Sequence, residues 1–133
     1  MGRRLILDTG VVIAAERGKV DLARILRPDD DIAIAMITVS ELYLGVELAN
    51  STHQGARKAF VDAFIAATPI EDHTLDVARF HARLMAYVRH TGRPRGAHDL
   101  IIAATAAATG RAVVTTDAKA DLGSLPDVTC VVC

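Results

Sequence analysis

Short runs of aliphatic residues alternate along this chain with longer segments of helical periodicity. The runs predict strands over Arg4–Leu7, Ile32–Met36, Thr68–Ile70, Ala112–Thr115 and Val128–Val132. Strands that are apolar on both faces and joined by helices form a parallel sheet that is covered on both sides. We therefore expect an α/β fold in which the functional crevice lies at the carboxyl ends of the strands.

The segments between the runs predict helices of different lengths. They are expected over Thr9–Arg17, Asp21–Arg27, Thr38–Ala49, Gln54–Ala66, His73–His90 and Ala97–Thr109. The longest should face the core through Leu75, Ala78, Ala82, Met85 and Val88, which share one side of a helix. With no repeat or linker, residues 1–133 are expected to form a single domain.

Composition excludes several classes of protein. The 133 residues carry a formal net charge of −1, which argues against binding nucleic acid through bulk positive charge but leaves room for a local basic face. No stretch approaches the roughly twenty apolar residues of a membrane span, so no membrane association is expected. Cys130 and Cys133 lie in a predicted strand, where positions three apart point to opposite faces. We expect free thiols in a reducing cytoplasm.

Four acidic residues are predicted to meet at one edge of the sheet. Asp8 and Asp117 directly follow predicted strands, and Glu41 lies in the first turn of a predicted helix. Asp99 begins the helix that leads into the strand before Asp117, so it starts at the edge where that strand ends. Clustered carboxylates repel one another unless a cation is present, and their oxygens suit Mg²⁺ or Mn²⁺. Such an ion supports hydrolysis of a phosphodiester.

Each acid also has a purely structural interpretation. The Thr38–Glu41 spacing fits a capping box, and Asp8 could be a helix N-cap. Asp99 could complement a helix dipole, and Asp117 could close an Asx turn. Capping and metal binding are compatible for one carboxylate, so these interpretations stay open.

Four motifs in order resemble the PIN domain, and more narrowly the VapC-type toxins of bacterial type II toxin–antitoxin systems. They are LILDTGVVI, ITVSELYLGV, GRPRGAHDLIIAATA and VVTTD. The resemblance implies a three-layer α/β/α sandwich with a mostly parallel sheet of four to five strands. It also implies a Mg²⁺-dependent endoribonuclease that cleaves structured RNA of the tRNA or rRNA class. A homodimer neutralised by a VapB-like antitoxin is implied as well.

Carried over by position, the acidic quartet of that family falls on Asp8, Glu41, Asp99 and Asp117. Asp8, Asp99 and Asp117 would hold the metal, and Glu41 would complete the site or its water shell. Thr116 resembles a family hydroxyl that supports this shell.

The sequence departs from the family at two places. Gly10 stands where a small hydroxyl or amide side chain is usual in that family, so a side chain that could hydrogen-bond near Asp8 is missing while Asp8 itself is in place. After Asp117 the usual acidic-aromatic pair is missing, and Asp121 is either an auxiliary acid or a solvated turn residue.

Other polar residues offer contacts for RNA. Arg93 and Arg95 flank Pro94 shortly before Asp99 and could hold phosphates, or could lie in a solvated turn. His98 is expected to point away from the acids because it is adjacent to Asp99 on a helix. Few aromatic residues, 4% of the chain, favour recognition through backbone charge and RNA shape over base stacking.

Other functions fit the residues less well. An aspartyl-nucleophile phosphatase needs a second acid where Gly10 stands, and a phosphorylation-receiver domain needs paired acids after the first strand. Neither a GxGxxG motif nor a P-loop is present. The alternative from a different class is a PIN-like module that binds and regulates without cleaving RNA.

Overall fold

The computed structural model describes residues 2–133 and contains a five-stranded, wholly parallel sheet in the order β3-β2-β1-β4-β5. The strands are β1 (Arg4–Leu7), β2 (Asp31–Ala35), β3 (Ile70–Glu71), β4 (Ala112–Thr115) and β5 (Thr129–Val132). The α-helices are α1 (Thr9–Glu16), α2 (Leu22–Ile25), α3 (Met36–Leu48), α4 (Ser51–Ala67), α5 (Leu75–Thr91) and α6 (Ala97–Thr109). Two short 3₁₀ helices, η1 (Ala118–Ala120) and η2 (Leu122–Ser124), precede β5. The predicted α/β fold is confirmed.

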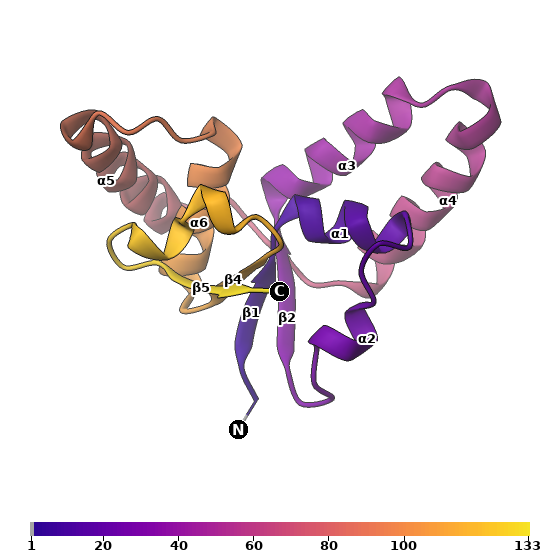
Figure 1. Ribbon diagram of the computed structural model, residues 1–133, viewed down its shortest axis with the longest axis horizontal. Coiled ribbons are helices and arrows are strands. Elements are labelled where there is room, and N and C mark those ends of the chain that lie inside the picture. The colour runs from indigo at the N-terminus through magenta and orange to yellow at the C-terminus, as the bar shows by residue number, and fades with distance from the viewer. Residues whose placement is uncertain (1) are drawn as a thin grey trace.

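Two hydrophobic cores lie on opposite faces of the sheet. Leu5 and Leu7 pack against α1, α3 and α4, whereas Ile6 packs with residues of α5, α6 and η2. This alternation follows from the two-residue period of a strand. Figure 1 shows α3 and α4 on one side of the sheet and α5 and α6 on the other. The predicted three-layer sandwich is therefore confirmed.

The strand order creates a crevice at the carboxyl edge. β1 pairs with β2 on one side and with β4 on the other, so the direction of winding reverses between β1 and β4. The backbone N–H of Asp8 donates to the carbonyl of Val114 at 2.9 Å, which holds the ends of these strands together. Ligands of open α/β sheets bind at such a reversal.

The predicted start of α3 is wrong by two residues, and this changes the role of Glu41. The helix begins at Met36 with Ala35 as its N-cap, directly after β2. Thr38 is fully buried, and its hydroxyl donates a hydrogen bond to Thr9 Oγ1 at 3.0 Å, since the single hydroxyl hydrogen of Thr9 goes to Glu41. Glu41 is therefore not part of a capping box.

The predicted core face of α5 is also wrong in part. Leu75 is 66% exposed and Met85 is 38% exposed, whereas Val77 and Leu84 are buried. Val88 packs against the core as expected. Among residues 2–133, neither α5 nor any other helix is long and apolar enough to cross a membrane.

A buried guanidinium directly before β4 contacts the three strands β1, β2 and β3. Arg111, with 5% of its side chain exposed, ion-pairs with Asp31 at 3.1 Å and with Glu71 at 3.2 Å. Its Nη1 also donates to the carbonyls of Leu5 and Asp31 at 3.2 and 2.9 Å. Arg111 thus links the start of β4 to β1, β2 and β3.

We expect Arg111→Ala to lower the free energy of unfolding by about 2–4 kcal/mol, because it leaves Asp31 and Glu71 without their shared cation. Arg4→Ala is the matched control, since Arg4 ion-pairs with the same Asp31 at 2.9 Å but is 51% exposed. Arg4→Ala should lower the free energy of unfolding by less than about 1 kcal/mol. Urea denaturation measures both values, and equal losses would contradict the role of Arg111.

Candidate active site

Asp8 directly follows β1, the central strand of the sheet, and lies at the N-cap position of α1. Its side chain makes no capping hydrogen bond to the helix; instead its Oδ2 accepts one from Thr115 Oγ1 at 3.0 Å. Burial raises the pKa of the Asp8 carboxyl, and the charges of Asp99 and Glu41 raise it further, while the Thr115 hydroxyl opposes the rise. Asp8 is thus a constrained acid within electrostatic reach of two others.

Glu41 is held from two sides in the second turn of α3. Thr9 Oγ1 donates to Glu41 Oε1 at 2.6 Å, and His98 Nδ1 lies 3.1 Å from Glu41 Oε2. The prediction that His98 points away from the acids is therefore wrong. Although His98 is adjacent to Asp99 on α6, it contacts an acid that α3 contributes.

Asp99 lies in the first turn of α6, as predicted. Burial raises the pKa of its carboxyl, and the negative charges of Glu41 and Asp117 add to the effect. His98 and Arg95 oppose this rise with positive charge. Asp99 therefore interacts electrostatically with acids from α3 and from the end of β4.

Asp117 begins the loop after β4 and forms the expected Asx turn. Its Oδ1 accepts hydrogen bonds from the backbone N–H groups of Lys119 and Ala120 at 3.0 and 3.2 Å. Its own N–H donates to Thr115 Oγ1 at 3.0 Å. Thr115 consequently contacts two acids, one through its hydroxyl hydrogen and one through its oxygen.

Two glycines leave space for the acidic side chains. A Cβ on Gly96 would lie 2.9 Å from Asp99 Oδ2, which is too close for an ordinary contact. The lack of a side chain there lets the Asp99 carboxylate lie against the start of α6. A Cβ on Gly10 would lie 3.9 Å from Asp8 Oδ2, so the residue leaves the adjacent side of that carboxylate open.

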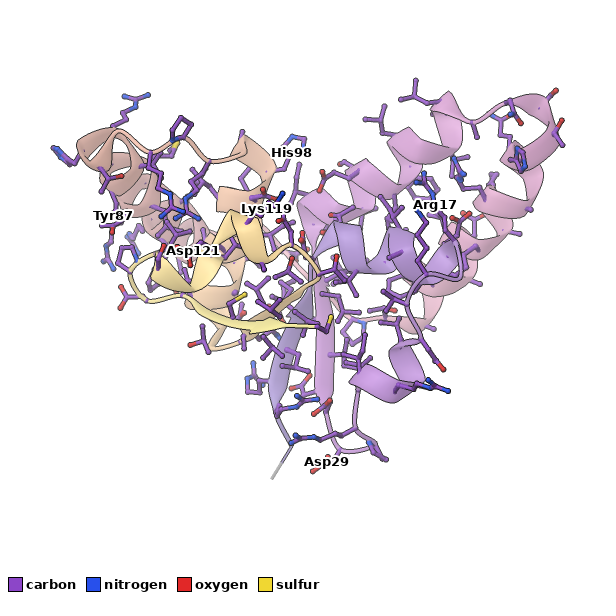
Figure 2. All side chains as sticks on the ribbon, in the orientation of Figure 1. Arg17, Asp29, Tyr87, His98, Lys119 and Asp121 are labelled. Atoms are coloured by element: carbon purple, nitrogen blue, oxygen red, sulfur yellow. The ribbon has the colours of Figure 1, made fainter. Side chains whose placement is uncertain are left out.

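Positive side chains border the acids on one side. A hollow of about 230 Å³ is lined by Arg93, Arg95 and Lys119 together with Asp99 and Asp117. Lys119 and His98 lie at the carboxyl end of the sheet in Figure 2, whereas Asp29 marks the opposite end. A polyanion at this edge would meet positive charge beside the acids.

The two remaining candidates, Thr116 and Asp121, lie outside the network of the acids. Thr116 is exposed, and the hydroxyl that contacts Asp8 belongs to the buried Thr115 instead. Asp121 is a left-handed residue (φ 49°) between η1 and η2, and it ion-pairs with Arg93 at 3.3 Å. This placement agrees with a turn residue.

The donor set fits a hard divalent cation in chemical type. It consists of carboxylates, with raised pKa values at Asp8 and Asp99 that a nearby cation would reverse. Over the part of the chain that the structure describes, no three His, Cys, Asp or Glu residues are already arranged as a metal-ligand group. Mg²⁺ commonly keeps several waters and takes only one or two carboxylates, so it does not need a closed protein cage.

Sequence comparison relates the chain to known ribonucleases. The family model of the PIN domain matches residues 5–122. Ribonuclease VapC5 of Mycobacterium tuberculosis is 36% identical over 115 residues, which are 84% of this chain and 82% of that protein. Ribonuclease VapC1 of Rickettsia felis is 29% identical over 116 residues, which are 86% of each protein.

Solved structures agree with this relationship. The VapBC-5 structure from Mycobacterium tuberculosis, a member of the VapBC family of toxin–antitoxin systems, contains a chain with a TM-score of 0.81 and 32% identity. DNA-bound VapBC from Salmonella typhimurium contains one with a TM-score of 0.85 and 25% identity. Both matches cover 98% of each chain. The chain therefore belongs to the PIN-domain family, in its VapC group.

Proposed function

We propose that this protein is a ribonuclease toxin of a VapBC-type toxin–antitoxin system, and that it cleaves structured RNA of the tRNA or rRNA class with Mg²⁺ or Mn²⁺. Asp8, Asp99 and Asp117 would hold the ion, and Glu41 would complete the site. When bound, a divalent cation activates water and stabilises the negative charge that develops on the phosphodiester.

The observation that carries this proposal is that Asp8 and Asp117 both contact Thr115 at the ends of β1 and β4, where Glu41 and Asp99 also act on the acids. The charges of Asp99 and Glu41 raise the pKa of Asp8. The charges of Glu41 and Asp117 raise the pKa of Asp99. A purely structural role for each acid would not explain why charges that repel one another share one edge. Relatives named as ribonucleases support the same activity.

Neighbouring side chains would fix the orientation of the acids without neutralising them. Thr115 donates to Asp8, and Thr9 donates to Glu41. Hydroxyl donors favour the charged form of a carboxylate, which is the form that binds a cation. These threonines would therefore act as outer-shell groups of the site.

Substrate contacts would come from the basic side of the hollow. Arg93 makes one exposed ion pair with Asp121, and a phosphate could replace that partner. Lys119 borders the same hollow and would add a second phosphate contact. The VapBC complexes among the similar structures support a VapB-like antitoxin as the protein partner, and we propose a homodimer as the toxin's own assembly.

We expect the purified protein, freed of antitoxin, to cleave total RNA in the presence of Mg²⁺. Cleavage should stop when EDTA is added to chelate the ion. Asp8→Asn and Asp99→Asn should each lower the rate by about 10³-fold, because each removes a charge that the cation needs. Denaturing gels measure the rates, and the end groups of the products identify the nucleophile. A water nucleophile leaves a 3′-hydroxyl, whereas the ribose 2′-hydroxyl leaves a 2′,3′-cyclic phosphate.

Two outcomes would contradict the proposal. Cleavage that survives both EDTA and the two substitutions would exclude the acidic metal site. A protein that binds its antitoxin but cleaves no RNA, with either Mg²⁺ or Mn²⁺, would support a regulatory module instead.

Thr115→Val should lower the cleavage rate by about 10- to 100-fold, because it removes the hydroxyl that orients Asp8 and preserves side-chain shape. Thr116→Val is the matched control, since Thr116 is the exposed neighbour. It should retain the wild-type rate in the same assay. A larger loss from Thr116→Val than from Thr115→Val would refute the assignment of the hydroxyl.

A further inference from the structure

Arg95 bridges the two segments that carry Asp99 and Asp117. Its Nη1 donates to the carbonyl of Ala120 and, at 2.9 Å, to the carbonyl of Asp121. Its Nη2 donates to Ser124 Oγ at 2.9 Å. Both terminal nitrogens of the guanidinium are therefore engaged with the loop that follows β4.

The bridge joins a loop that is otherwise anchored by Ala120, which packs against the core, and by the exposed Arg93–Asp121 ion pair. Its residues 117–121 are exposed except for Ala120, which is half-buried. Asp121 adopts a left-handed backbone conformation, which is uncommon outside glycine although Asp adopts it more readily than most residues. Ser124 Oγ also donates to the Asp121 carbonyl at 2.8 Å, so the Arg95 guanidinium and Ser124 hold the same residue.

The bridge reaches Asp117 through the η1 turn. The Asp117 carboxylate accepts from the N–H groups of Lys119 and Ala120, and the carbonyl of that same Ala120 accepts from Arg95. Arg95 itself lies one residue before Gly96, the N-cap of α6, and Asp99 lies in the first turn of that helix. The contacts therefore fix the loop of one acid to the helix start of the other.

We propose that Arg95 is a positioning residue that sets the placement of Asp117 relative to Asp99, and not a phosphate ligand. This inference rests on the proposed function, because it assigns a role within that site. Arg93 differs from Arg95 in that its single ion pair with Asp121 is exposed on both sides. The two arginines, which the sequence presents as a pair, thus have different roles.

The first test compares steady-state kinetics of RNA cleavage. Arg95→Ala should lower kcat by about 10²-fold with little change in KM, since a displaced acid impairs the chemical step. Arg95→Lys should recover part of kcat, because an ammonium reaches the carbonyls but lacks the fork that also reaches Ser124. Arg93→Ala should raise KM and flatten its salt dependence, as expected for a lost phosphate contact. Arg24→Ala, on the exposed surface of α2, is the inert control.

The second test needs no catalysis. Hydrogen exchange of the Lys119 and Ala120 amides should be about tenfold faster in Arg95→Ala than in wild type, because the turn that protects them is released. A titration with Mn²⁺, monitored by electron paramagnetic resonance, should show that the same variant binds Mn²⁺ more weakly than wild type does. Ser124→Ala removes one partner of Arg95 and should produce a smaller change in both measurements, which covers the case in which Arg95→Ala does not fold.

The results separate this inference from the proposed function. A rise in KM with unchanged kcat in Arg95→Ala would make Arg95 a phosphate ligand and overturn the inference. Unchanged kcat and unchanged amide exchange would also overturn it. If wild-type protein cleaves no RNA but Arg95→Ala still weakens Mn²⁺ binding and speeds amide exchange, the positioning role stands and the ribonuclease proposal fails.

Discussion

Negative charges from two strand ends and two helices act on one another at the carboxyl ends of β1 and β4. Burial and neighbouring acids raise the pKa values of Asp8 and Asp99, so the charged forms cost free energy in the folded protein. Apolar packing opposes this cost. Leu5, Ile6 and Leu7 fix β1 between two cores, and β1 in turn carries Asp8 to the edge.

The hydroxyl and backbone donors around the acids orient them without supplying compensating charge. Thr115 and Thr9 are neutral donors, and backbone N–H groups hold Asp117. Arg95 is engaged by carbonyl and hydroxyl oxygens of the loop after β4, although its charge still lowers the pKa of Asp99. A divalent cation bound at this edge would neutralise the remaining negative charge.

Topology made the acidic edge predictable, because residues that follow parallel strands share one edge wherever they lie in the sequence. The choice between Thr115 and Thr116 was not predictable in the same way. β4 is buried on both faces, so no alternation of polar and apolar residues indicates which hydroxyl points inward. The contact of His98 with Glu41 depends on how α3 approaches α6, and two helices distant in sequence carry no local signal of their packing.

Thermal unfolding of wild type and Asp8→Asn, with EDTA or with Mg²⁺, tests most directly whether carboxylate repulsion is the cost that a cation removes. In EDTA at neutral pH, Asp8→Asn should have the higher Tm, because the raised pKa of Asp8 means that its charge destabilises the fold. The difference should begin to shrink as the pH falls through that raised pKa, and it should disappear below the ordinary pKa of an aspartate, where Asp8 is protonated in both the folded and the unfolded state. Mg²⁺ should raise the Tm of wild type more than that of the variant. A lower Tm for Asp8→Asn in EDTA, or equal shifts with Mg²⁺, would contradict this account.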